Sequence, residues 1–130
     1  MGERRNISSG SPYERVVGFS RAVRVGDRVV VAGTAPVMPE GAEPPEDAYA
    51  QAKRCLEIIR AALDEAGASV EDVVRTRVYL VRTADFNEVG RAHGEVFSEI
   101  RPANTTLTVA ELADPRWLVE IEAEAVVTGG

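Results

Sequence analysis

The chain has very few of the residues that most often bind metal ions or form covalent cross-links. Its 130 residues include one cysteine, Cys55, and one histidine, His93. A single cysteine excludes a disulfide bond within one chain and a zinc site built from several cysteines, and a single histidine excludes a histidine-rich metal site. The sequence also lacks a P-loop, a GxGxxG fingerprint and a GxSxG nucleophile motif. We therefore expect neither a metal ion nor a cofactor.

Long apolar runs are also absent. No stretch approaches the roughly 18 consecutive apolar residues that a membrane span needs. No apolar run follows the basic residues of the N-terminal segment MGERRNISSG, so we expect no secretory signal. We therefore expect a cytoplasmic protein without a membrane partner. Asn104-Thr105-Thr106 spells a glycosylation acceptor, but that motif matters only in the secretory pathway, so we expect Asn104 to be unmodified.

Positive charge is the minority sign. The formal net charge is −6, the sequence pI is about 4.9, and Lys53 is the only lysine. An acidic chain repels a phosphate backbone, and no run of basic residues forms an obvious stripe, so we expect no nucleic-acid partner. With 45% hydrophobic and 28% charged residues, the composition is that of an ordinary globular protein, and the length suits one domain over residues 1–130.

The order of predicted elements indicates an α+β fold. The first helix is predicted from the three- and four-residue spacing of its apolar residues, and Gly67 is placed just after its end. Two β-branched runs around Gly26-Asp27 predict a hairpin. The predicted strands are Val16–Val25, the VVVAGTA run that follows the hairpin turn, Asp72–Arg82, Thr105–Ala110 and Leu118–Val127, and the predicted helices are Asp47–Ala66 and Asp85–Ile100. The order β-β-α-β-α-β-β predicts a two-layer sandwich, with two helices on one face of a mixed sheet.

One face of the predicted sheet carries charges instead of apolar residues. Alternation in the last strand places Val119, Ile121 and Ala123 on one face and a row of three carboxylates, Glu120, Glu122 and Glu124, on the other. In the strand before the second helix, Val74, Thr76, Val78 and Leu80 are predicted under the helices, and Val73, Arg75, Arg77, Tyr79 and Val81 on the free face. That face is either a solvated surface with salt bridges or a partly buried oligomer interface or pocket.

Two side chains that could take part in chemistry, His93 and Cys55, can also be interpreted as structural residues. His93 lies beside the apolar stripe of the second helix, so it is either a structural or interface histidine or a functional one. Cys55 lies on the apolar face of the first helix, which predicts a buried, unreactive thiol. Gly33, at the end of a strand, indicates a bulge or a close approach of another group rather than a phosphate-binding loop.

Four stretches resemble, in this order, the RidA family, also called the YjgF or L-PSP endoribonuclease family. They are SPYERVVGFSRAVRVGDRVVVAGTAPV, AYAQAKRCLEIIRAALDEAGASVEDVVRTRVYL, DFNEVGRAHGEVFSEIRPA and LVEIEAEAVV. The resemblance covers nearly the whole chain. It implies a chorismate-mutase-like fold and a homotrimer whose sheets face inward, with three small-molecule clefts between neighbouring subunits. In the deaminating members, an imine is hydrolysed to a 2-keto acid and ammonia.

Three positions match residues to which the family gives a role. Glu120 matches a glutamate that places the attacking water, so the resemblance implies that it is catalytic. Tyr13 matches a tyrosine that lines the cleft, and Gly33 matches a glycine after the second N-terminal strand. The resemblance therefore implies that Tyr13 and Gly33 help to bind the substrate.

Other positions depart from the family pattern. The arginine that grips the substrate carboxylate corresponds to Asn104, because the chain reads PAN where the family reads PAR. Thr106 replaces a common cysteine, Gly90 a common asparagine and Ala32 a common serine. We still expect Asn104, Thr106 and Gly90 to contact the ligand. An amide contacts a carboxylate less strongly than a guanidinium by about 1–2 kcal/mol, which lowers the rate by about tenfold. Four other arginines are candidates to replace the missing guanidinium: Arg75, Arg77, Arg91 and Arg101.

Three functions follow from this reading. The first is an enzyme that hydrolyses a small imine or enamine, with Glu120 positioning water. The second is a non-catalytic binding or sensing trimer, which the neutral Asn104 amide favours because it suits carbonyl and hydroxyl groups. The third, cleavage of RNA, has little support in an acidic chain with one histidine.

Overall fold

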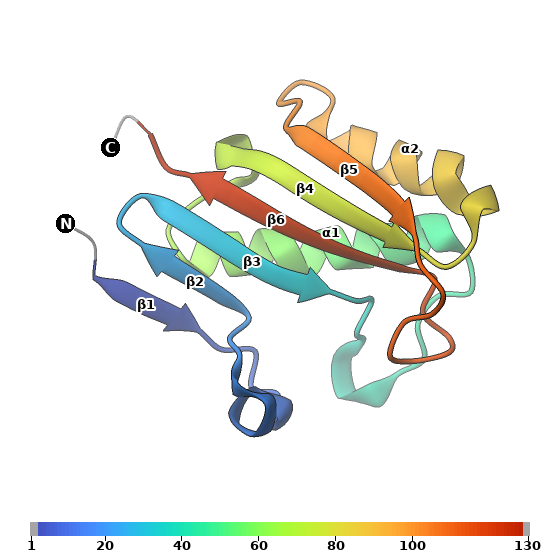
Figure 1. Cartoon of the computed structure of the whole chain (residues 1–130), viewed down its shortest axis with the longest axis horizontal. Helices are drawn as coiled ribbons and strands as arrows, with labels where there is room; N and C mark the ends of the chain where they lie inside the picture. The colour runs from blue at the N-terminus through green and yellow to red at the C-terminus, as the bar shows by residue number, and fades with distance from the viewer. Residues whose placement is uncertain (1–2, 129–130) are drawn as a thin grey trace.

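The computed structural model describes residues 3–128, which form one six-stranded sheet with two helices on one face (Figure 1). In chain order the elements are β1 (Arg4–Ile7), β2 (Ala22–Val25), β3 (Arg28–Thr34), α1 (Ala48–Glu65), β4 (Val73–Leu80), α2 (Phe86–Phe97), β5 (Ala103–Thr108) and β6 (Val119–Val126). The strand order is β1-β2-β3-β6-β4-β5. Only the pairing of β4 with β5 is parallel among these strands. The predicted α+β fold class is confirmed.

The first helix follows its sequence signals closely. The Asp47 side chain accepts a hydrogen bond from the Ala50 backbone N–H at 3.0 Å, so Asp47 is the N-cap of the helix. The helix therefore begins at Ala48, one residue after its predicted start at Asp47. At the other end Gly67 has φ 82°, a left-handed conformation that favours glycine. The predicted inner face is buried against β3 and β6: it comprises Ala52, Cys55, Leu56, Ile59 and Leu63.

The N-terminal region differs from the prediction. The segment Glu14–Gly18 forms a single wide helical turn, and Val16 and Val17 are 81% and 69% exposed. The predicted start of a strand at Val16 is therefore wrong: within residues 3–128 these valines pair with no strand and stay exposed. The strand begins at Ala22. A further strand, β1, was missed because Arg4–Ile7 is mostly polar and acquires strand structure by pairing with β2.

A β-bulge changes the predicted faces of β4. The pairing of β4 with β6 shifts register between Val73 and Arg75. As a result Val73 is 3% exposed and packs in the core, whereas Val74 is 48% exposed. The assignment of these two valines to faces was wrong, since strict alternation fails where one strand has an extra residue. From Arg75 to Tyr79 the predicted alternation is confirmed.

The second helix is shorter than predicted. It ends at Phe97, and the chain then leaves through Arg101, whose φ is 58° and whose backbone N–H donates to the Phe97 carbonyl oxygen at 2.7 Å. Val89, Ala92 and Phe97 are buried, but Phe86, which was expected in the apolar stripe, is 55% exposed. The following strand starts two residues before its predicted start, because Ala103 already pairs with Arg75 of β4.

Candidate functional site

The free face of the sheet carries a chain of cross-strand contacts. Arg77 Nη1 lies 3.0 Å from Glu122 Oε1 and 3.5 Å from Glu124 Oε2, and the Tyr79 hydroxyl donates to Glu122 at 2.9 Å. Arg28 pairs with Glu124 at 3.2 Å. The predicted pairing of opposite charges across β4 and β6 is therefore present. Each pair is partly exposed, so its contribution to stability is small.

Glu120 differs from the other two carboxylates of β6. It is half-buried, and no hydrogen bond or ion pair reaches its carboxylate from the described residues 3–128. Burial raises the pKa of Glu120, an effect that the nearby Arg21 guanidinium opposes. A half-buried, unpaired carboxylate with a raised pKa is a recurrent feature of groups that transfer protons.

The neighbouring strand makes room for the Glu120 carboxylate. A Cβ atom on Gly33 would collide with Glu120 Oε2. The pairing of β3 with β6 also shifts register between Val31 and Thr34, so Gly33 lies in an irregular part of β3. The interpretation of Gly33 as a point of close approach is confirmed, and the approaching group is the Glu120 side chain.

Arg21 was missed by the sequence analysis. Its Nη2 atom lies 2.6 Å from the Ala32 carbonyl oxygen, 2.9 Å from that of Gly33 and 2.7 Å from Thr34 Oγ1. Burial lowers the pKa of Arg21, while the Glu120 carboxylate opposes that effect. The guanidinium thus holds the irregular end of β3 and adds positive charge near Glu120. No sequence signal separates it from the other arginines, because its role depends on the bulge in β3.

Asn104 and Thr106 lie on the opposite, helix-covered face of the sheet. The Thr106 hydroxyl donates to Asn104 Oδ1 at 2.9 Å, and Asn104 Nδ2 donates to Thr76 Oγ1 at 3.0 Å. Thr76 is completely buried, and its hydroxyl lies 2.8 Å from His93 Nε2. The His93 ring lies 4.7 Å from the Phe97 ring, centre to centre, and burial lowers the pKa of His93.

A small cavity of about 90 Å³ adjoins this hydrogen-bonded chain. Its polar wall is His93, Asn104 and Thr106, and its remaining lining residues are Val78, Phe86, Val89 and Gly90. A Cβ atom on Gly90 would meet no atom within 4 Å, so the helix leaves open space there. The cavity can receive the head group of a small, partly apolar ligand.

The candidate residues therefore form two groups within one chain. Asn104, Thr106 and Gly90 come together beneath α2, whereas Glu120 and Gly33 come together on the free face of the sheet. The structure does not bring the two groups to one point of a single chain, because the sheet separates them. Tyr13 lies at the start of the Glu14–Gly18 turn, where its side chain is 66% exposed.

The four candidate replacement arginines are engaged or placed elsewhere. Arg75 and Arg77 belong to the free face, where Arg77 pairs with Glu122. Arg91 pairs with Glu88 at 2.8 Å and lies 3.7 Å from the centre of the Tyr49 ring. Arg101 follows α2 in its left-handed conformation and is exposed. The partners of the Asn104 amide are instead Thr76 and Thr106.

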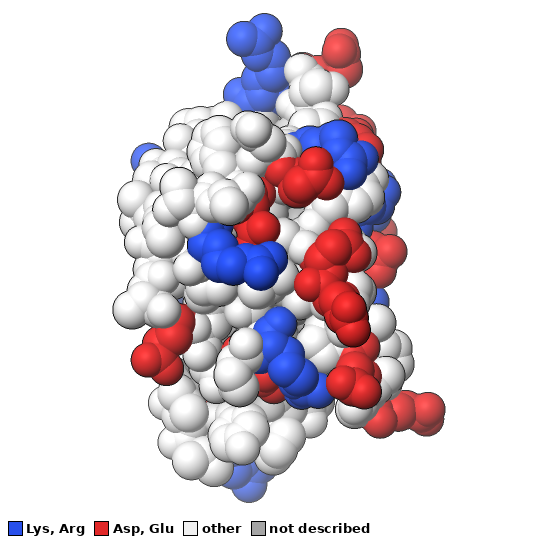
Figure 2. Space-filling view, turned by 90° about the vertical axis from the view of Figure 1, so that its right-hand side faces the viewer, with Lys and Arg blue, Asp and Glu red and all other residues white. Residues whose placement is uncertain are grey.

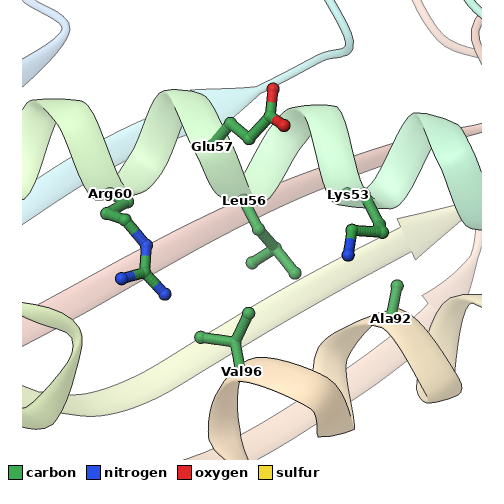
Figure 3. Close-up of a pocket in the computed structure, with 6 residues that line it drawn as sticks. All are labelled: Lys53, Leu56, Glu57, Arg60, Ala92 and Val96. Carbon is green, nitrogen blue, oxygen red and sulfur yellow. The ribbon is translucent and has the colours of Figure 1, made fainter.

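A second depression, of about 170 Å³, lies between α1 and α2 (Figure 3). Leu56, Ala92 and Val96 give it an apolar lining, and the side chains of Lys53 and Arg60 point from α1 toward α2, whereas Glu57, which also lines it, points away from α2. Lys53 is already paired with Glu95 at 3.3 Å. The depression lies on the outer surface of the helices and holds no convergent set of polar groups. It is a weaker candidate than the cavity beneath α2.

Other classes of site have no support in the described part of the chain. Within residues 3–128, no three potential metal-binding side chains gather at one place, and neither helix is long and apolar enough to cross a membrane. Figure 2 shows acidic and basic side chains interspersed on one side of the molecule, without a continuous basic surface on that side. Cys55 is fully buried in the core and its pKa is raised by burial, as expected of an unreactive thiol.

Comparison with known proteins gives consistent matches over most of the chain. Residues 11–127 match the family model described as endoribonuclease L-PSP. The chain is 32% identical to 2-iminobutanoate/2-iminopropanoate deaminase of Escherichia coli K12, over 94% of this chain and 95% of that protein. The crystal structure of Rv2704 from Mycobacterium tuberculosis, a member of the YjgF/YER057c/UK114 family, superposes with a TM-score of 0.88 at 45% identity, covering 96% of this chain and 100% of that one. E. coli TdcF with bound serine superposes with a TM-score of 0.80 at 29% identity, covering 95% and 94%.

Proposed function

This chain belongs to the endoribonuclease L-PSP family, also called the RidA or YjgF family, and on that premise we propose that it forms a homotrimer that binds a small metabolite in clefts between subunits. The separation of Glu120 from Asn104 and Thr106 supports this arrangement, because only a second copy of the chain can bring both groups to one ligand. The exposed apolar side chains Val16, Val17, Val30 and Leu107 support burial between copies.

The reaction that the Glu120 environment favours is hydrolysis of an imine, or of the enamine that tautomerises to it. Glu120 accepts a proton from water as the water oxygen bonds to the imine carbon, and that proton passes to the nitrogen to give a carbinolamine. The proton left on the new hydroxyl group then moves to the nitrogen as the carbon–nitrogen bond breaks, so that the nitrogen leaves as ammonia and the oxygen becomes the carbonyl oxygen. The products are a carbonyl compound and ammonia. The observation that carries the proposal is the half-buried Glu120 carboxylate, which has no bonding partner among residues 3–128 and whose pKa is raised, since a proton acceptor and donor works best when its pKa approaches the working pH.

The altered part of the proposal concerns the substrate. We assign Asn104 to the position of the family's carboxylate-binding arginine, with Thr106, Gly90, Gly33 and Tyr13 as further ligand contacts. A neutral amide cannot form the two charge-assisted hydrogen bonds that a guanidinium forms with a carboxylate, so the substrate differs from a 2-imino acid. The E. coli relatives, a 2-imino acid deaminase and a protein with bound serine, indicate small amino-acid-like compounds as the starting class for a search.

Ammonia release from freshly generated enamines tests the reaction. Wild-type protein should release ammonia faster than buffer alone, and Glu120→Gln should lose at least about 100-fold in rate, the usual contribution of a positioned acid–base group. Glu122→Gln is the matched control, because Glu122 lies on the same face but is held by Arg77 and Tyr79. If wild type shows no release with several enamines, the hydrolase proposal is wrong.

Complementation tests the composite cleft. Glu120→Gln and Asn104→Ala variants should each be weak alone, and trimers that contain both should recover part of the activity, since some clefts then combine an intact Glu120 with an intact Asn104. Light scattering should give three chains per particle. A monomer, or mixed trimers without recovery, contradicts the arrangement.

The second candidate function is ligand binding without catalysis. It is favoured by the Asn104 amide, whose oxygen and one N–H already have partners in the protein and which bears no charge. Ligands that raise the melting temperature but are recovered unchanged after incubation would support it. RNA cleavage has little support in an acidic chain with one histidine, and we expect purified protein to leave RNA intact.

A further inference from the structure

The hydrogen bonds beneath α2 run in one direction. Thr106 donates to Asn104, Asn104 donates to Thr76, and the Thr76 hydroxyl lies against His93 Nε2. Thr76 is completely buried, so its single hydroxyl hydrogen has no water to bond to. One lone pair of Thr76 already accepts from Asn104, and a buried hydroxyl hydrogen without a partner is unfavourable. His93 Nε2 must therefore accept from Thr76.

An accepting Nε2 requires a neutral ring that carries its proton on Nδ1. The burial that lowers the pKa of His93 favours this neutral form. Phe97 packs on the ring, and Val78 and Val89 line the adjoining cavity. Among residues 3–128, burial alone shifts the pKa of His93, and no carboxylate there favours the charged ring.

The direction of the chain decides what the cavity offers to a ligand. If Nε2 donated instead, the Thr76 hydroxyl would donate to Asn104, the amide would turn over, and Thr106 would receive a hydrogen bond rather than give one. With His93 accepting, the amide presents its second N–H, and Thr106 presents its lone pairs. The wall of the cavity therefore combines one donor and one acceptor, both neutral.

We propose that His93 is a positioning residue that ends a relay from Thr106 through Asn104 and Thr76, and that this relay selects a neutral carboxamide over a carboxylate. A carboxamide can form a hydrogen bond with each group: its oxygen accepts from the Asn104 N–H, and its own N–H donates to Thr106. A carboxylate has no hydrogen to donate, so its second oxygen would face the Thr106 lone pairs without a bond. This inference rests on the proposed ligand site and names its substrate class.

Binding of pyruvamide and pyruvate, measured by ligand-observed NMR or calorimetry, tests the selectivity. These two probes differ only in the group at issue. Wild type should bind pyruvamide at least about tenfold more tightly, the ratio expected when one neutral hydrogen bond is replaced by an unpaired buried group. Asn104→Arg should reverse the preference. Equal or tighter binding of pyruvate by wild type, or no binding of either probe, overturns the inference.

The Asn104→Arg variant also separates this inference from the proposed function. If that variant binds pyruvate while wild type binds neither probe, the cleft exists and only the carboxamide preference is wrong. If no variant binds either probe and no enamine is hydrolysed, the proposed function fails as well.

Substitutions at position 93 test the relay. His93→Phe keeps an aromatic ring beside Phe97 but cannot accept a hydrogen bond, so the preference for pyruvamide should disappear. His93→Gln offers an amide oxygen as acceptor and should restore it. If His93 were purely structural, phenylalanine would be tolerated better than glutamine at this position. An unchanged preference for pyruvamide over pyruvate in His93→Phe would overturn the relay.

Two further measurements guard against misfolded variants. In wild type, ¹⁵N NMR of the imidazole should show the proton on Nδ1, and a proton on Nε2 would contradict the proposal without any mutation. Thr106→Val should abolish the preference, whereas Thr108→Val should not. Thr108 is a matched control in the same strand, because its hydroxyl bonds to Thr83 and not to the cavity.

Discussion

The two faces of the sheet hold polar groups in opposite conditions. On the free face Glu120 is a charged group without a bonding partner among the described residues, kept half-buried beside Gly33. Beneath α2, Asn104 and Thr76 are neutral and bonded to each other and to their neighbours. An unsatisfied ionisable group can exchange protons, whereas a satisfied neutral network fixes geometry. Under the proposed function, the first face would supply reactivity and the second selectivity.

Gly33 closely approaches Glu120, so we expect its substitution to have the largest effect on the difference between the two faces. Gly33→Ala places a methyl group where the carboxylate lies, so the side chain or the strand must move. We expect a loss of about 1–3 kcal/mol in the free energy of unfolding, typical of overpacking, with a fall in any Glu120-dependent ammonia release. Urea denaturation and initial rates measure the two effects. An alanine variant with normal stability and rate would show that the glycine is not needed.

The neutral network can be broken at its buried centre. Thr76→Val keeps the shape of the side chain but removes the bonds to Asn104 and His93. We expect a loss of about 1–3 kcal/mol in unfolding free energy, since both former partners are left unsatisfied. Thermal or urea denaturation measures it, and Thr105→Val, whose side chain is exposed on the other face of β5, is the control. A change no larger than in the control would mean that water replaces the lost bonds.

Gly90 sharpens the contrast with Gly33, since one glycine has a close neighbour and the other has open space. Gly90→Ala should stabilise α2 by about 0.5–1 kcal/mol, because alanine is the better helix former and its methyl group meets nothing within 4 Å. The expected result is a higher melting temperature together with weaker ligand binding, since the methyl group enters the cavity lining. A lower melting temperature would contradict the observed space.

The smallest expected effect is a pH dependence with opposite signs on the two faces. The pKa of Glu120 is raised above its usual value of 4.5 in the folded protein, so its stabilising effect is present below that value and is lost as the pH rises through the folded pKa. Glu120→Gln should therefore melt at a higher temperature than wild type at neutral pH, and the difference should vanish in acid.

The pKa of His93 is lowered below its usual value of 6.5, so its contribution is present above that value and is lost as the pH falls through the folded pKa. His93→Gln should therefore lose less stability than wild type when the pH falls from neutral to acid. Melting curves over this range measure both variants, and parallel curves for wild type and variants would contradict the assigned directions.

Local signals in the sequence predicted the regular elements well. Asp47 and Gly67 marked the two ends of α1, and the alternation of glutamates with apolar residues in β6 separated its two faces correctly. The same kind of reasoning failed where structure depends on a neighbour. β1 exists because it pairs with β2, and the bulge at Val73 and Val74 exists because β4 must match β6.

The candidate site was predictable only in part. The resemblance to the RidA family gave Glu120 and Gly33 separate roles in one cleft, and the structure adds that the Glu120 carboxylate lies against Gly33. It did not indicate that His93 and Thr76 occupy the space around Asn104, or that Arg21 holds the bulge beside Glu120. These contacts join residues far apart along the chain, and nothing in the local pattern of either partner specifies the other.

The sequence by itself determined the class of fold, the ends of α1, the polar face of β6 and the absence of a histidine- or cysteine-rich metal site. These features depend on residue type, spacing and periodicity, which act over a few residues. Only the tertiary structure decided that Glu120 lacks a bonding partner among the described residues while Glu122 and Glu124 are paired, and that Asn104 is linked by hydrogen bonds through Thr76 to His93. Burial and hydrogen-bond direction are set by the packing of distant segments, and that packing gives chemically identical residues different roles.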